Sequence, residues 1–193
     1  FFNYVIRDEI VPFTINQNTF FRNATRTNRI GLEFGFMCKP IEGLEVVTNY
    51  TYTNFKYKDY RALIQGPSGN YVEEYSENYV PSIPQHIVNF ILNFEFEISE
   101  TFSGLLQWDC DYLSRMYVND KNSETAPAYF YGNVMGGINF SVGNLNTVFF
   151  VGANNIFDRR YVGYININDF FGRYYETGEP RAVYSGLNVT YKF

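Results

Sequence analysis

Polar and apolar residues alternate strictly along several segments of the chain. In the clearest segment, residues 86–98, every second position from Val88 onward is apolar: Val88, Phe90, Leu92, Phe94, Phe96 and Ile98. The opposite set is largely polar and includes Asn89, Asn93, Glu95 and Glu97. A period of two is typical of a β-strand with two unlike faces. At about 3.4 Å per residue, this segment exceeds the roughly 25 Å apolar band of a transmembrane β-barrel.

The same alternation recurs and predicts about eight strands. The expected strands are 2–10, 30–38, 44–53, 86–98, 102–112, 130–140, 146–154 and 183–193, of which the first is the least regular. Short connections (39–45, 97–101, 141–146) alternate with long ones (11–28, 56–85, 114–128, 155–181). Such sorting is typical of an antiparallel up-and-down meander whose two ends face different environments, as in outer-membrane barrels. A soluble sandwich has no need of it.

Composition narrows the class of protein. Aromatic residues make up 20% of the chain and charged residues only 18%, against a usual value of about 25%. The mean hydropathy is −0.25, and no run of 18 apolar residues predicts a transmembrane helix. A soluble β protein and a transmembrane β-barrel both fit, and the tyrosines and tryptophan near strand ends favour the barrel. With a net charge of −5 and no cluster of Lys or Arg, the chain is not expected to bind nucleic acid.

Three segments resemble a known family. NNIFDRRYV (154–162), followed by GRYYETGEPRAVYSGLNVTYKF (172–193), resembles the C-terminal end of TonB-dependent outer-membrane receptors. Residues 22–60 resemble the Gly-x-Glu strand, turn and Tyr-Thr-rich strand of that family. VPSIPQHIVNFILNFEF (80–96) resembles its Val-Pro-x-x-Pro-x-His segment. The three matches occur in the family's order and cover nearly the whole chain.

The resemblance implies an all-β architecture, with residues 1–193 as the C-terminal segment of a 22-stranded barrel whose lumen is plugged. The plug domain and the earlier strands would lie outside this sequence. The implied function is active transport across the outer membrane of a Gram-negative bacterium, with a ferric siderophore or a similar scarce nutrient as the ligand. The implied partners are outer-membrane lipid and the TonB energy-coupling complex, which acts through the missing N-terminal part. The resemblance implies no enzyme activity, no cofactor and no metal-ligating residue.

Five residues in the last long connection are candidates for contact with the ligand: Arg159, Arg160, Arg173, Tyr174 and Tyr175. Guanidinium groups and tyrosine rings suit anionic iron chelates through charge, hydrogen bonding and stacking. The alternatives are local pairing of Arg159 and Arg160 with Asp158 and Asp169, and an interfacial role for the two tyrosines.

The end of the chain carries an expected membrane-insertion signal. Val189, Tyr191 and Phe193 stand at alternate positions, with Gly186 three residues before Val189. This pattern resembles the C-terminal signal that the barrel-insertion machinery reads, and a terminal aromatic side chain suits the membrane interface. The alternative is an ordinary strand that happens to come last.

Cysteines and lumenal carboxylates complete the expected picture. Cys38 and Cys110 fall on the apolar faces of strands that are not neighbours, which predicts two free, lipid-facing thiols. Asp109 and Asp111 share the polar face, where they would line a permeation path, meet the plug or remain solvated.

Two alternatives stay open at this point. One is a complete eight-stranded outer-membrane barrel with a structural or adhesion role, and the other is a soluble all-β binding domain. A third of a larger barrel would leave two open strand edges. We therefore predict an open curved sheet in which the first and last strands do not meet.

Overall fold

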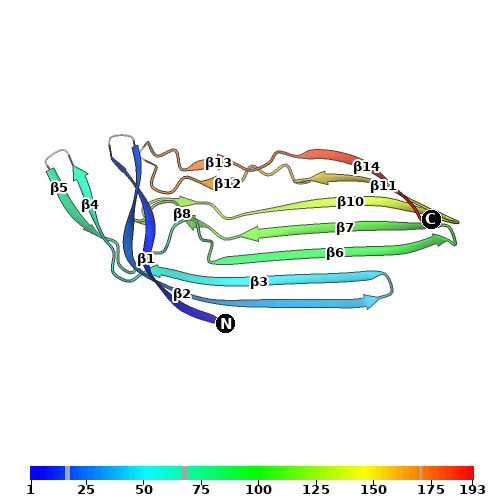
Figure 1. Cartoon of the computed structure of the whole chain (residues 1–193), viewed down its shortest axis with the longest axis horizontal. Helices are drawn as coiled ribbons and strands as arrows, with labels where there is room; N and C mark the ends of the chain where they lie inside the picture. The colour runs from blue at the N-terminus through cyan, green and yellow to red at the C-terminus, as the bar shows by residue number, and fades with distance from the viewer. Residues whose placement is uncertain (16–17, 67–68, 170) are drawn as a thin grey trace.

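The computed structural model describes residues 1–15, 18–66, 69–169 and 171–193. One eight-stranded antiparallel sheet dominates it (Figure 1). Its strands, in their order across the sheet, are β1 (Phe2–Ile15), β2 (Asn18–Ile41), β3 (Leu44–Tyr57), β6 (His86–Ser99), β7 (Phe102–Leu113), β10 (Tyr129–Val142), β11 (Leu145–Asn154) and β14 (Ala182–Tyr191). No helix among the described residues is long and apolar enough to cross a membrane.

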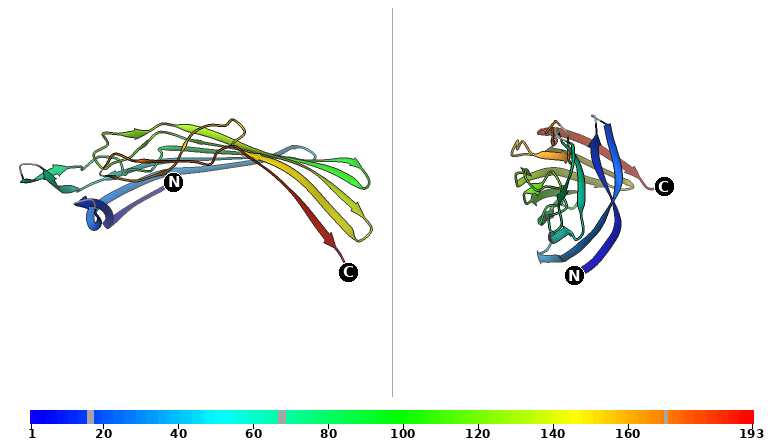
Figure 2. Two further views of the ribbon diagram at one scale, coloured as in Figure 1. Left: turned by 90° about the horizontal axis from the view of Figure 1, so that it is seen from above. Right: turned by 90° about the vertical axis from the view of Figure 1, so that its left-hand side faces the viewer.

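The sheet is an open, curved meander. Each strand pairs with the next strand of the sheet along the chain, and β1 and β14 form its two edges. Figure 2 shows the curvature, with the two termini apart from each other. The prediction of an open sheet is confirmed. A closed eight-stranded barrel would pair β1 with β14, and the order of the strands contains no such pair.

The connections are sorted as the sequence predicts. Tight turns join β2 to β3, β6 to β7 and β10 to β11 at one end of the sheet, on the right of Figure 1. Gly43 and Gly143 stand in two of these turns with φ of 77° and 57°, a backbone conformation that glycine adopts without strain. The long connections lie at the other end and carry three small hairpins: β4 (Arg61–Gly66) with β5 (Gly69–Glu74), β8 (Met116–Tyr117) with β9 (Thr125–Ala126), and β12 (Val162–Ile165) with β13 (Tyr175–Thr177).

The expected loop over residues 11–28 is wrong. β1 continues to Ile15 and β2 begins at Asn18, with one constant register along the whole hairpin. Antiparallel pairing requires only backbone donors and acceptors, so it continues where the side chains no longer alternate. Asp8, with a φ of 56°, interrupts the pairing of β1 with β2, and the hairpin twists away from the sheet beyond it (Figure 1).

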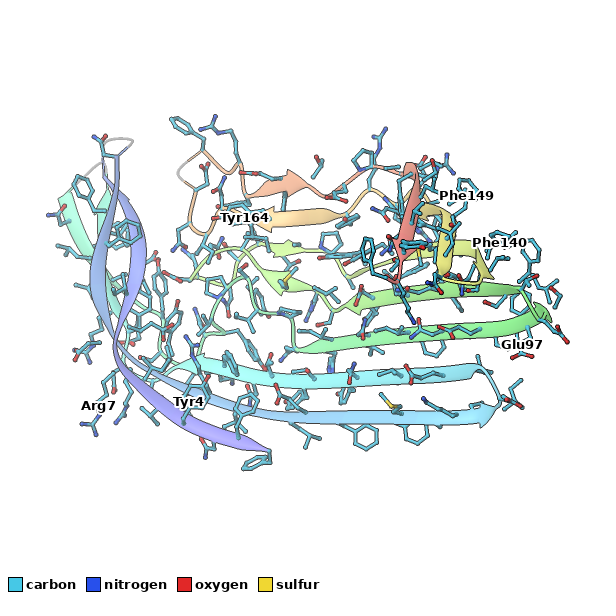
Figure 3. The ribbon with its side chains drawn as sticks, turned by 45° about the vertical axis from the view of Figure 1, so that its right-hand side comes forward. Tyr4, Arg7, Glu97, Phe140, Phe149 and Tyr164 are labelled. Carbon is cyan, nitrogen blue, oxygen red and sulfur yellow. The ribbon has the colours of Figure 1, made fainter. Side chains whose placement is uncertain are left out.

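Apolar and polar positions line up across the sheet. Phe34, Tyr50, Val88, Tyr112 and Phe130 are successive cross-strand partners, so they share one face, which we call the apolar face. The residues next to them in sequence are also cross-strand partners and lie on the opposite face, which we call the polar face. They are Gly35, Asn49, Asn89, Asp111 and Tyr131. Figure 3 labels Phe140 and Phe149, which lie on the apolar face near the tight turns.

The buried core lies in the long connections and at the strand ends that adjoin them, and not over the faces of the sheet. One cluster consists of Val11, Tyr57, Tyr60, Ala62 and Tyr75. A second consists of Met116, Val118, Ala126 and Ile165. On the apolar face of the sheet, by contrast, Phe34 is 58% exposed and Leu187 is 65% exposed. The sheet is therefore a single layer whose apolar face has no covering within the described chain.

Candidate ligand-binding site

Amide and carboxylate side chains link neighbouring strands across the polar face. The Asn49 amide on β3 donates to Asn89 on β6 over 3.2 Å, and the Asn89 amide donates to Asp111 on β7 over 2.9 Å. These residues are direct partners in the antiparallel register, which brings their side chains together on one face. The polar face is thus hydrogen-bonded from strand to strand and carries negative charge.

A second chain of hydrogen bonds leads from the polar face into the last long connection. The Asn133 amide donates to Asp109 over 2.6 Å, and its oxygen accepts from the backbone N–H of Asn155 over 2.9 Å. Asn155 is buried and has a φ of 47°, a conformation that asparagine tolerates better than most residues. Its amide donates to the carbonyls of Arg159 and Glu179 at 2.9 and 3.1 Å. Asn155 therefore holds both ends of connection 155–181 against the sheet.

A hollow of about 640 Å³ opens on the polar face, between β10 and the β12–β13 hairpin. Tyr129 and Tyr131 of β10 and Tyr161, just before β12, contribute three rings to its wall. The ring centroid of Tyr161 lies 5.0 Å from that of Tyr131, with an interplanar angle of 6°, and 5.0 Å from that of Tyr129. Figure 3 labels Tyr164 of β12, which also lines the hollow. The three rings therefore stack on one another along this wall, and Tyr161 also packs against Gly178.

One buried carboxylate joins the three long connections that follow β3, β7 and β11. Asp120, in connection 114–128, accepts from the Tyr57 hydroxyl over 2.7 Å and from the Tyr60 hydroxyl over 2.9 Å. The Asn168 amide, in connection 155–181, donates to the same carboxylate over 2.8 Å. The Asn78 amide donates to the Asp120 carbonyl over 2.8 Å. We call this cluster the Asp120 latch.

Further contacts surround the latch. Lys121 forms an ion pair with Glu73 over 3.1 Å, and the Tyr75 hydroxyl donates to the same carboxylate over 2.6 Å. The hydrogen bond from Tyr75 and the nearby Lys121 lower the pKa of Glu73. Burial, followed by the contact with Glu73, raises the pKa of Tyr75. The outer rim of the latch therefore contains a carboxylate that stays ionised in mildly acidic solution.

The predicted ligand residues are not gathered in one place. The guanidinium of Arg159 lies 4.9 Å from the ring centroid of Phe130, which belongs to the apolar face, and Arg160 is exposed beside it. The guanidinium of Arg173 lies 3.9 Å from Asp169 and covers the ring of Phe171.

The two candidate tyrosines lie near the β8–β9 hairpin. Tyr174 packs against the second core cluster, and the Tyr175 hydroxyl donates to the Thr125 carbonyl over 3.0 Å. Their ring centroids are 6.2 Å apart. None of the five candidates lines the hollow. The alternative pairing of Arg159 and Arg160 with Asp158 and Asp169 is not among the ion pairs of the described residues, because Asp169 pairs with Arg173 at 3.9 Å and Asp158 with Arg181 at 3.5 Å.

The residues of the expected insertion signal lie on the edge strand β14 and at its end. Val189 and Tyr191 belong to the apolar face, and Phe193 is fully exposed beyond the strand. Gly186 lies on the polar face under the ring of Phe150, whose Cζ would be 2.3 Å from a Cβ at this position. The glycine therefore leaves space for an aromatic side chain of the neighbouring strand.

The two cysteines are placed as predicted. Cys38 on β2 and Cys110 on β7 are free thiols on the apolar face, with β3 and β6 between their strands. Among the described residues, no group of three or more His, Cys, Asp or Glu side chains is placed to hold a metal ion.

Sequence reasoning missed Asp120, Asn155 and Tyr161. The resemblance does contain a signal for Asn155 and Tyr161, since NNIFDRRYV carries both residues, yet that signal indicates a family and not a structural role. Asp120 lies in a long connection, where no periodic pattern indicates which residues will meet.

The comparison with known families decides the classification. The model of the family "TonB dependent receptor-like, beta-barrel" matches residues 1–156. The chain belongs to this family. Its members are receptors and not enzymes, and they lie in the outer membrane of Gram-negative bacteria.

Solved receptor structures share the fold of this chain. The ferric preacinetobactin receptor BauA of Acinetobacter baumannii has a TM-score of 0.70 at 17% identity and is matched over 99% of this chain and 26% of its own. The ferric yersiniabactin uptake receptor FyuA of Yersinia pestis gives 0.67 at 17% identity, over 99% and 26%. The closed form of the ferric-catecholate import receptor Fiu of Escherichia coli K12 gives 0.64 at 19% identity, over 98% and 24%. The chain thus spans about a quarter of the length of these receptors.

Proposed function

We propose that this chain is the C-terminal segment of the barrel of an outer-membrane active-transport receptor. One observation carries the proposal: a single curved sheet has one apolar face that no described part of the chain covers, and one hydrogen-bonded polar face. Lipid would cover the apolar face, and the polar face would line the lumen. The long connections would then face the outside and the tight turns the periplasm, as in other outer-membrane barrels.

The two open edges of the sheet support the presence of further strands in the same protein. β1 and β14 each have one side that no described strand pairs, and unpaired strand edges are unfavourable in a membrane. We propose that the remaining barrel strands pair with these edges and that a plug domain fills the lumen. The plug would couple transport to the TonB complex, as membership of this family supports.

The proposed cargo is a ferric siderophore or a similar scarce nutrient. The structural neighbours named above are receptors for ferric chelates, and the latch holds the external connections together as one surface. We propose the exposed Arg160 and Arg173, together with Arg159, Tyr174 and Tyr175, for contacts with ligand at that surface. Gly186, Val189, Tyr191 and Phe193 are proposed to act as the signal for the barrel-insertion machinery.

Cell fractionation and uptake test the proposal together. The full-length protein should appear in the outer-membrane fraction, and its deletion should abolish growth on one scarce nutrient. Disruption of TonB should have the same effect as the deletion. A protein found in the soluble fraction, or uptake that is unchanged without TonB, would refute the proposed function.

A further inference from the structure

A fixed turn after β11 brings a cation to the rim of the apolar face. The Arg159 backbone N–H donates to the Asn155 side-chain oxygen over 3.0 Å, and the Asn155 amide donates to the Arg159 carbonyl over 2.9 Å. The backbone of Arg159 is therefore held by two hydrogen bonds, and its guanidinium lies 4.9 Å from the ring centroid of Phe130. The two tyrosines that flank Phe130 in the sequence line the hollow on the polar face, so Arg159 lies on the other side of the sheet.

The ring beneath this cation belongs to an apolar surface that no described part of the chain covers. Phe157 packs edge-on against Phe130, with the ring centroids 5.5 Å apart, and is 45% exposed. Tyr112, the direct partner of Phe130 on β7, is 40% exposed. An arginine at the edge of a lipid-facing surface lays its methylene chain along that surface and keeps its charge at the level of the lipid headgroups. Phosphates are the anionic groups that it meets at this level.

The same turn is positively charged, although the chain as a whole has a net charge of −5. Arg160 is exposed next to Arg159, and Arg181 pairs with Asp158 over 3.5 Å. Residues 155–160 together with Arg181 thus set three guanidinium groups against one carboxylate. Among the described residues, neither Arg159 nor Arg160 forms an ion pair. The excess of positive charge at this rim favours an anionic partner.

We propose that Arg159, with Arg181 beside the same turn, binds a phosphate group of an outer-leaflet lipid. The planar guanidinium donates two parallel hydrogen bonds to the phosphate, while the rings of Phe130 and Phe157 contact the acyl chains. The proposal rests on the proposed function, which places the long connections outside the cell and the apolar face in lipid. For Arg159, the lipid phosphate takes the place of the ligand contact proposed above, because the hollow lies on the other side of the sheet.

Photo-crosslinking on the purified full-length receptor tests the site. Benzoylphenylalanine replaces Phe157, which puts the reactive ketone on an exposed ring beside Phe130 and the cation above it. The protein, in a polyoxyethylene detergent, is titrated with lipid A that carries two phosphates, and mass spectrometry measures the yield of lipid joined to residue 157. Lipid A without phosphates should need a concentration about tenfold higher for half-maximal yield. Equal half-maximal concentrations for the two lipids would overturn the proposal.

Variants locate the phosphate contact at Arg159. Arg159→Ala should raise the half-maximal concentration of the phosphorylated lipid about tenfold and leave that of the dephosphorylated lipid unchanged. Arg159→Lys, which keeps the charge and loses the planar fork, should raise it about threefold. Arg61→Ala removes an arginine of β4 whose side chain is 81% exposed; it is the matched control and should change nothing. Binding of the phosphorylated lipid by Arg159→Ala as in the wild type would overturn the proposed site.

Competition separates a lipid site from a site for a free anion. A large excess of inorganic phosphate should leave the yield of crosslinked lipid unchanged, because the acyl chains add contacts with the apolar face that free phosphate lacks. Displacement of the lipid by inorganic phosphate would show a site for a free anion and overturn the lipid as the occupant. Failure of the lipid site alone leaves the protein in the outer membrane with TonB-dependent uptake intact, whereas failure of the proposed function appears as a protein in the soluble fraction.

Discussion

Replacement of Asp120 by alanine should release the three latched connections from one another. The buried carboxylate accepts from Tyr57 at 2.7 Å, Tyr60 at 2.9 Å and Asn168 at 2.8 Å. A hydrogen bond to a charged acceptor contributes about 1.5–3 kcal/mol. Counting one such hydrogen bond to each of the two neighbouring connections, at about 1.5 kcal/mol each, the carboxylate stabilises the closed arrangement by about 3 kcal/mol. Because 1.4 kcal/mol is a factor of ten, the open population of the connections should rise about a hundredfold.

Hydrogen exchange measured by mass spectrometry on the full-length protein reports this opening. Two reporter amides bridge the connections or join them to the sheet: Asn168 donates to the Val118 carbonyl, and Val80 donates to the Phe55 carbonyl. Exchange over residues 58–85, 114–128 and 155–181 should accelerate about a hundredfold in the variant, since open populations set exchange rates. The amides of β6 and β7 should exchange as in the wild type.

Lys121→Ala is the matched control for the latch. It removes the neighbouring ion pair with Glu73, in which the lysine side chain is 59% exposed. Exposed ion pairs contribute about 1 kcal/mol or less, so exchange should accelerate less than about fivefold. Acceleration confined to residues 114–128 in the Asp120 variant would show that the connections are ordered independently, and would refute the latch.

Glycine packing, a loop carboxylate and the last residue offer further tests. Gly152→Ala should lower the free energy of unfolding, measured in a urea titration, by about 1–3 kcal/mol, because the new Cβ would lie 2.3 Å from the ring of Tyr184. Gly136→Ala is the control and should not lower it, because its Cβ would meet its nearest neighbour at 4.0 Å. The pKa of Glu73 is lowered in the folded protein, so its contacts stabilise residues 69–76 above the ordinary pKa of 4.5. This stabilisation is lost as the pH falls through the pKa of the folded state, and hydrogen exchange over residues 69–76 should rise in that range. Glu73→Gln should abolish this dependence of exchange on pH. Phe193→Ala should reduce the amount of protein in the outer-membrane fraction several-fold, without lowering its synthesis.

The strands could be predicted because a single physical constraint acts on them. Each strand has one face in an apolar environment and the other in a polar one, so apolar and polar residues alternate along its sequence with a period of two. The register then aligns the apolar sets of adjacent strands, as in the pairing of Phe90 with Cys110 and of Leu92 with Trp108. The extension of β1 and β2 could not be predicted, because backbone pairing in this hairpin continues where polar and apolar residues no longer alternate.

The site could be predicted less well, because alternation fixes a face only while the strand lasts. Arg159 follows the end of β11 by five residues, and the turn held by Asn155 places its guanidinium over Phe130 on the apolar face. The parity of a position beyond a strand thus says nothing about the face on which its side chain lies. The role of Asp120 depends on three separate connections lying side by side, and that of Tyr161 depends on its connection lying against β10.

The distribution of packing divides the molecule into two parts with different requirements. The connections, together with Val11 of β1 and Tyr57 at the end of β3, form two buried clusters and satisfy the Asp120 carboxylate, so described residues supply their packing. The sheet leaves apolar side chains such as Val183, 74% exposed, without a partner, and covering one such side chain is worth about 1.5–3 kcal/mol. The sheet therefore gains its stability from what surrounds it, while the latched connections provide a fixed external rim. The hollow lies between these two parts, with Tyr131 on the sheet and Tyr161 in a latched connection. Its shape consequently depends on both the strand register and the latch.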